Sequence, residues 1–102
     1  MIERRVAVTD PAGLHARQAA GVVRVASRFG SRTIIRHGGR EANARSIIEL
    51  LGLAIGPSTE VTLVAEGDDA EAALDALADQ LAPDPSNRAA PSTRASSSMS
   101  DA

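Results

Sequence analysis

The sequence contains no cysteine, lysine, tryptophan or tyrosine, and Phe29 is its one aromatic residue. Without cysteine the chain forms no disulfide, no zinc-thiolate site and no thiol nucleophile. A single aromatic ring provides no platform on which nucleic-acid bases could stack. The two histidines stand at unrelated positions and do not indicate a metal site. We therefore expect neither a metal nor a cofactor.

Long apolar runs are also absent from this chain of 102 residues. No segment approaches the roughly 20 apolar residues of a membrane span, and residues 1–5 lead into a strand-like stretch instead of a signal-peptide core. We expect a cytoplasmic protein that does not insert into a membrane. A domain of this size buries only about 60 to 65% of its unfolded surface, so a deep catalytic cleft is not expected.

Charge is distributed unevenly along the chain. Residues 1–45 contain nine arginines and three acids, a balance of +6, whereas residues 46–82 contain eight acids and no basic residue, a balance of −8. Such asymmetry attracts an acidic partner, which can be a protein or a nucleic acid. Arg17, Arg24 and Arg28 recur at spacings of seven and four and share one side of a helix. A solvated helix face is the alternative explanation for these arginines.

The periodicity of apolar residues predicts four strands and three helices. Alternation indicates strands at 2–9, 32–36, about 40–43 and 60–66, and helical spacing indicates helices at 16–26, 46–52 and 70–82. For the first helix the apolar positions are 16, 19, 20, 23 and 26; for the last they are 70, 73, 74, 77, 78 and 81. The order β-α-β-β-α-β-α predicts an α+β fold with a mostly antiparallel sheet covered on one face by helices. Residues 83–102 lack periodicity and are rich in Pro, Ser and Ala, so we predict a domain at 1–82 and a disordered tail at 83–102.

Ser46 stands immediately before the short central helix. It begins a Ser-x-x-Glu pattern that ends at Glu49, which is typical of a capping box. We therefore predict Ser46 as the N-cap of this helix.

His15 is the strongest candidate for a functional residue. Turn-forming residues at 10–13 precede it and the first helix follows, so His15 lies at or just before the first turn. The first amides of a helix lack intrahelical acceptors and carry partial positive charge, which favours an anion. Imidazole is a good nucleophile near neutral pH, and a phosphoryl group on His15 would lie close to the guanidinium of Arg17. The alternative is a solvated structural histidine, which is our reading of His37 in its turn-like context.

Three segments resemble one known family in order and spacing. Residues 13–20, GLHARQAA, are similar to the active-site signature GLHARPA of HPr, the histidine-containing phosphocarrier protein of the bacterial phosphoenolpyruvate:sugar phosphotransferase system. Residues 43–48 resemble the regulatory-serine segment of HPr, and residues 56–67 resemble its last strand and turn. Gln18 replaces the usual proline of the signature, which restores a backbone donor and adds a flexible side-chain amide.

The resemblance implies an open-faced β-sandwich, with four strands covered on one face by three helices. It also implies that His15 accepts a phosphoryl group on Nδ1 from enzyme I, that Arg17 stabilises this group, and that enzyme IIA receives it. The protein would then be a monomeric carrier and not an enzyme. Ser46 would be the residue that HPr kinase phosphorylates. Docking of partners would use Ala20, Arg24, Ile47, Ile48 and Leu51, although we expect at least one of the three aliphatic residues to be core.

Two other functions remain open at this stage. One is a regulatory HPr paralogue that binds regulatory proteins according to its phosphorylation state, for which Gln18 is the main support. The other is a small nucleic-acid-binding domain that uses the arginines of residues 4–45. The acidic second half of the chain and the missing aromatic residues argue against it.

Overall fold

The computed structural model describes residues 1–83, and these form four strands and three helices in the predicted order. The strands are β1 (Ile2–Ala7), β2 (Arg32–His37), β3 (Arg40–Asn43) and β4 (Glu60–Glu66). The helices are α1 (Ala16–Ala26), α2 (Ile47–Gly52) and α3 (Ala70–Leu81). Apart from Pro83, the predicted tail lies outside the described residues. No helix within residues 1–83 is long and apolar enough to cross a membrane.

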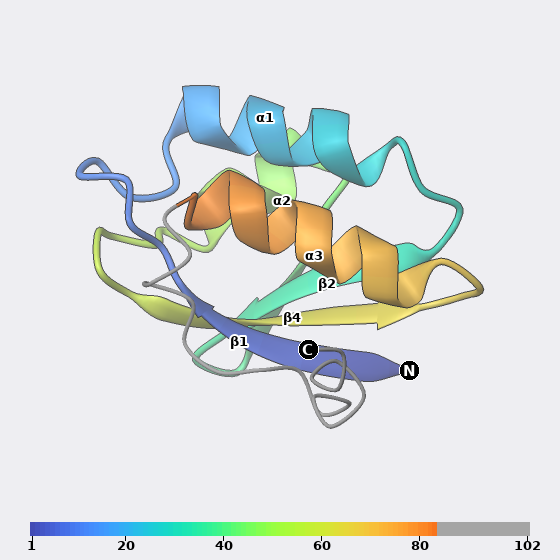
Figure 1. Cartoon of the computed structure of the whole chain (residues 1–102). Helices are drawn as coiled ribbons and strands as arrows, with labels where there is room; N and C mark the ends of the chain where they lie inside the picture. Colours follow the sequence, from blue (N-terminus) through green and yellow to red (C-terminus); the bar gives the residue numbers. More distant parts are fainter. Residues whose placement is uncertain (84–102) are drawn as a thin grey trace.

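The four strands form one sheet in the order β1-β4-β2-β3, and all three neighbouring pairs are antiparallel. The helices lie together on one face of this sheet (Figure 1). Every second strand residue faces the helices, and most of these residues are buried. Two such buried pairs of neighbouring strand residues are Val6 opposite Val61 and Ile35 opposite Leu63. The α+β open-faced sandwich expected from the sequence is confirmed.

Helix α3 buries the predicted face, but α1 is rotated relative to its prediction. All six expected positions of α3 are buried. In α1 the buried residues include Val22 and Val25, whereas Ala16 is exposed and Val23 is only half-buried. The expected face of α1 relied on four alanines, which gain little from burial, and the two larger residues Val22 and Val25 decide the orientation instead.

Arg4 is a charged residue that points into the space between the sheet and α3. Its side chain is 8% exposed, and its Nη1 lies 2.5 Å from Asp75 Oδ1 while its Nη2 lies 3.6 Å from Glu71 Oε2. A buried guanidinium is tolerated only when carboxylates pair with it. One arginine of the basic first part of the chain therefore pairs with carboxylates of the acidic second part, and this pairing joins β1 to α3.

The turn between β4 and α3 is joined to the segment that follows α1. The carboxylate of Asp69 accepts hydrogen bonds from the amides of Gly30 and Ser31, at 3.0 and 2.9 Å, and from the Ser31 hydroxyl. Gly67 permits this approach, because a Cβ there would lie 2.6 Å from Ser31 Oγ. The bond from the Ser31 hydroxyl, followed by that from the Gly30 amide, lowers the pKa of Asp69 below its ordinary value.

Asp69 should make the stability of the fold depend on acid. Its lowered pKa means that the folded state binds a proton less readily than the unfolded state. The contribution of Asp69 to the free energy of unfolding is therefore complete above an ordinary Asp pKa of about 3.9, and it is lost as the pH falls through the pKa of Asp69 in the folded state. We expect Asp69→Asn to be less stable than wild type at neutral pH and the difference to close in acid. Urea unfolding of both proteins across this pH range measures it. A difference that stays constant into strong acid would contradict this role.

The loop between α2 and β4 contains two residues in the left-handed region. Ala54 has a φ of 53° and Ser58 a φ of 58°, and neither is glycine. This conformation costs an L-residue roughly 1 to 2 kcal/mol. The loop is strained at both positions, although glycine occurs nearby: Gly52 ends α2, and Gly56 lies between Ala54 and Ser58.

Glycine should relieve the strain at Ala54. We expect Ala54→Gly to raise the free energy of unfolding by about 0.5 to 1 kcal/mol, the relief of strain minus the entropy cost of glycine. The matched control is Ala72→Gly, an exposed site within α3, which should lose about 1 kcal/mol. Thermal or urea unfolding measures both, and the same sign of effect in the two variants would refute the assignment.

Candidate functional site

His15 ends the loop that joins β1 to α1, and backbone hydrogen bonds hold that loop on both sides. The amide of Val8 donates to Thr59 O at 2.9 Å, and the amide of Ser58 donates to Val8 O at 2.8 Å. The amide of Thr9 donates to Leu81 O at 3.1 Å, and the Thr9 hydroxyl contacts the same carbonyl. The loop is thus joined to the α2–β4 loop and to the end of α3.

Gly13 and Leu14 fix the approach to His15. The amide of Leu14 donates to Ile55 O at 2.9 Å, and the Leu14 side chain is buried. Gly13 has a φ of 72°, and a Cβ there would lie 2.4 Å from Ile55 O and 2.7 Å from the carbonyl carbon of Gly56. Because those neighbours are backbone atoms, no side chain at position 13 fits without movement of the loop. Gly13 is therefore required for the close contact that positions His15.

His15 is the N-cap residue of α1. Its backbone is extended, its carbonyl accepts from the Ala19 amide at 2.8 Å, and its side chain is about one-third exposed. Within residues 1–83 its imidazole makes no capping hydrogen bond, and the first turn of α1 contains no acidic residue. No carboxylate from the first turn therefore opposes the partial positive charge of the helix start. Arg17 is exposed and is the second residue of this helix.

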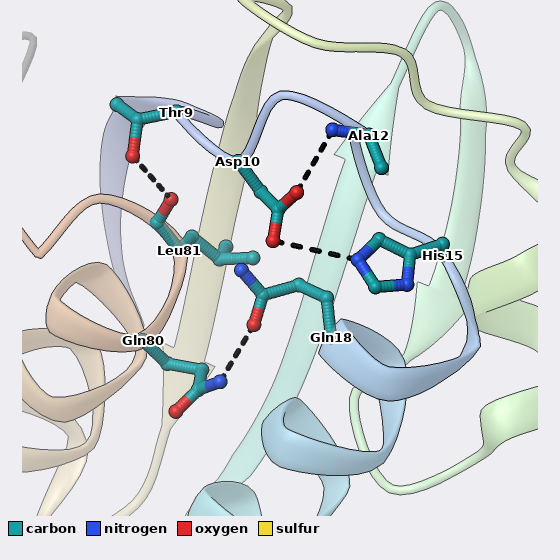
Figure 2. A network of polar contacts seen from close by, with 7 residues as sticks. All are labelled: Thr9, Asp10, Ala12, His15, Gln18, Gln80 and Leu81. Carbon is teal, nitrogen blue, oxygen red and sulfur yellow. Dashed lines mark hydrogen bonds and ion pairs between the residues drawn. The ribbon is translucent and has the colours of Figure 1, made fainter.

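Asp10 contacts His15 from within the same loop, as Figure 2 shows. Its Oδ2 lies 3.4 Å from His15 Nε2, and its Oδ1 accepts the Ala12 amide at 2.8 Å. The Ala12 bond is the main cause of a lowered pKa of Asp10, and His15 and Arg17 lower it further. The sequence predicts Asp10 only as a turn former, and the structure adds its contact with His15. An Asp that closes a turn five residues before a candidate nucleophile was the signal available.

Gln18 is turned toward α3. Its side chain is 9% exposed, and its Oε1 accepts from Gln80 Nε2 at 2.6 Å (Figure 2). Gly21 leaves room for this pair, because a Cβ there would lie 2.3 Å from Gln80 Nε2. The expectation of a flexible amide at position 18 is wrong, since the amide is buried and bonded. The residue that departs from the HPr signature joins α1 to α3.

Ser46 caps α2 as predicted, although the capping box is formed differently. Its hydroxyl accepts from the Glu49 amide at 3.2 Å. In a capping box Glu49 would accept from the Ser46 amide, but that amide donates to Asn43 O. The Oε1 atom of Glu49 accepts instead from the Asn43 amide at 2.8 Å. Glu49 therefore joins α2 to the end of β3.

The proposed docking residues lie on exposed surface of α1 and α2, two helices that pack together. Arg17 and Arg24 are exposed and Ala20 is half-buried. On α2 the exposed fractions are 39% for Ile47, 80% for Ile48 and 38% for Leu51. The expectation that at least one of these three is core is wrong, because the short helix buries Leu50 instead. Such an apolar surface is typical of a protein-binding site.

His37 lies outside this arrangement. It is half-buried at the end of β2, opposite Arg40 across the β2–β3 hairpin. Among residues 1–83, no group of three or more His, Cys, Asp or Glu side chains is placed to hold a metal ion. The structure thus places Asp10 against His15 at the start of α1, where Arg17 is the second helical residue.

The family model described as "PTS HPr component phosphorylation site" matches residues 2–82. The chain belongs to this family. HPr-family proteins are phosphocarriers of the phosphotransferase system, with a phosphohistidine as the carried form.

Three known proteins illustrate the similarity to this HPr-family chain. The HPr-like protein Crh of Bacillus subtilis is 44% identical over 78 residues, 76% of this chain and 92% of Crh. The structure of phosphocarrier protein HPr from Bacillus anthracis has a TM-score of 0.75 and 43% identity, covering 78% of this chain and 94% of HPr. An HPr dimer from Thermoanaerobacter tengcongensis has a TM-score of 0.61 and 40% identity, covering 71% and 83% of the two chains.

Proposed function

We propose that this protein carries a phosphoryl group on Nδ1 of His15, between enzyme I and an enzyme IIA of a sugar phosphotransferase system. The observation that carries the proposal is the position of His15 as a partly exposed N-cap, directly before the first amides of α1 and two residues before Arg17. Those amides and the guanidinium favour the dianionic group. In this proposal the protein is not an enzyme, because it supplies the nucleophile and the partner supplies the phosphoryl group.

The moderate strength of this site suits a carrier. A phosphoryl group must persist between encounters, yet its transfer to the next partner must not become unfavourable. An exposed helix terminus contributes about 0.3 to 1 kcal/mol to the binding of an anion, and one arginine adds a charge-assisted hydrogen bond. A histidine that is one-third exposed at the surface also permits in-line approach by two different partners in turn.

The docking surface comprises Ala20, Arg24, Ile47, Ile48 and Leu51. Exposed apolar residues on one helix and arginines on the helix packed against it are typical of a protein interface with an apolar core and a polar rim. The positive residues of α1 would attract partners with an acidic face and raise the rate of association. We propose that the carrier acts as a monomer in the cytoplasm; size measurement in solution tests this against the dimeric state of the Thermoanaerobacter relative.

The two alternatives are weakened by particular contacts. Three of the arginines that a nucleic-acid site would need are paired with carboxylates. Arg4 is buried against α3, Arg5 lies 4.0 Å from Glu60, and Arg36 pairs with Glu3 and Glu41. These arginines therefore do not form one basic face for nucleic acid. A regulatory role drew its support from Gln18, whose amide is engaged by Gln80. The similarity to Crh keeps that role as the second candidate. An assay of transfer from the phosphorylated protein to an enzyme IIA distinguishes the carrier role, which requires this transfer, from the regulatory role, which does not.

Incubation with enzyme I and phosphoenolpyruvate should label His15 alone. We expect acid-labile, base-stable phosphate on wild type and on His37→Ala, and none on His15→Ala. Arg17→Ala should slow transfer while its melting temperature stays close to that of wild type, because the arginine contact matters only when a phosphoryl group is present or arriving. Histidine labelling of His15→Ala would refute the site, and a destabilised Arg17→Ala with normal transfer would make Arg17 structural.

Ser46 gives a test of the docking surface. We propose that HPr kinase can phosphorylate it, and the resulting charge of about −1.5 to −2 would stabilise the start of α2 but repel an acidic partner. Ser46→Asp should fold as wild type does and accept phosphate from enzyme I more slowly. The control is Ser46→Ala, which should lose about 0.5 to 2 kcal/mol of stability with the cap and keep normal transfer. Equal transfer rates for Ser46→Asp and wild type at low salt would leave Ser46 a helix cap only.

A further inference from the structure

Asp10 places a carboxylate against the His15 ring. Its orientation is fixed, because Oδ1 accepts the Ala12 amide and the Asp10 carbonyl accepts the Gly13 amide, both at 2.8 Å. The other oxygen, Oδ2, faces His15 Nε2. An ionised carboxylate only accepts hydrogen bonds, so the ring nitrogen that faces it must carry the proton.

We propose that Asp10 is a positioning residue that holds the proton of His15 on Nε2 and thereby leaves the lone pair of Nδ1 free for phosphoryl transfer. This inference rests on the proposed function for its consequence in transfer, but the tautomer itself can be measured in the unphosphorylated protein. The nitrogen opposite a hydrogen-bonded N–H is the available nucleophile, and the partner of that N–H decides which nitrogen it is.

The same contact strengthens during the reaction. As Nδ1 forms its bond to phosphorus, the bond between phosphorus and its donor atom on enzyme I breaks, and the electron pair of that bond returns to the donor. The His15 ring keeps its Nε2 proton and becomes an imidazolium. A separation of 3.4 Å is long for a hydrogen bond in the resting state. The growing positive charge shortens and strengthens it, so that Asp10 favours the transition state over the ground state.

On transfer to the next partner these steps reverse. The protonated ring leaves as a neutral imidazole when the phosphorus–Nδ1 bond breaks, because the proton stays on Nε2. Asp10 therefore serves both directions without itself taking up the proton. Its lowered pKa agrees with a carboxylate that remains ionised throughout.

Asp10→Asn gives a sharper test than removal of the side chain. The Ala12 amide would still require an acceptor, so the asparagine oxygen should occupy the place of Oδ1 and its NH₂ group should face His15 Nε2. That group is a donor, which makes Nε2 the acceptor and moves the proton to Nδ1. Asparagine would thus block the nucleophile, whereas alanine would leave the two tautomers in exchange.

The experiment uses nitrogen-15 spectra of the imidazole in the full chain carrying His37→Ala, so that His15 is the one histidine observed. In buffer alkaline enough to keep imidazole neutral, we expect a protonated Nε2 in wild type, a protonated Nδ1 in Asp10→Asn and an averaged signal in Asp10→Ala. Asp68→Asn, an exposed change of the same charge, should match wild type. A protonated Nδ1 in wild type, or the same tautomer in wild type and Asp10→Asn, would overturn the proposal.

Transfer rates then link the tautomer to function. Phosphorylation by enzyme I should fall about 100-fold in Asp10→Asn and about tenfold in Asp10→Ala, and it should be unchanged in Asp68→Asn. An Asp10→Asn protein with the altered tautomer and a normal rate would overturn the role in transfer. A wild-type protein that shows the Nε2–H tautomer but accepts no phosphate from enzyme I would refute the proposed carrier function and leave the positioning by Asp10 intact.

Discussion

The contact between the Gly13–Leu14 backbone and the Ile55–Gly56 backbone determines where His15 stands. The hydrogen bond from Leu14 to Ile55 and the space beside Gly13 bring two loops together at the start of α1. Because this contact consists of main-chain atoms, its side-chain requirement falls on position 13, where a Cβ has no room. The α2–β4 loop supports it at the cost of left-handed residues at Ala54 and Ser58. The loop that carries the candidate nucleophile thus rests on a strained loop from which α1, β2, β3 and α2 separate it in the sequence.

Charge serves two separate purposes in this fold. Arg4 is buried with carboxylates of α3, where a lost partner would leave an uncompensated charge in the interior. Arg17 and Arg24 are exposed on α1, where their charge attracts anions and acidic surfaces. The net charges of +6 for residues 1–45 and −8 for residues 46–82 do not show which arginines are buried in ion pairs and which are exposed. Only the antiparallel placement of β1 beside β4, with α3 packed over them, separates structural arginines from those available to a partner.

Periodicity predicted every element of the described region to within two residues, because alternating strands and a clearly amphipathic α3 give strong signals. The rotation of α1 could not be predicted as well, since alanine and glycine contribute little to an apolar face and Gln18 is buried through a partner 62 residues away. The position of His15 and Arg17 at a helix start followed from turn formers and spacing. The roles of Asp10 and Glu49 required coordinates, because either carboxylate could have faced solvent.

The site around His15 is open, with the ring one-third exposed and its neighbours supplied by a loop and a helix end. An enzyme that encloses its intermediate protects it from water, whereas in the proposed phosphorylated form of this protein water would reach the same phosphorus that the next partner must reach. The yield of each cycle would then depend on the competition between spontaneous hydrolysis and encounter with the acceptor. The abundance of the acceptor protein would shift that competition, so the efficiency of transfer would depend on concentrations as much as on this molecule.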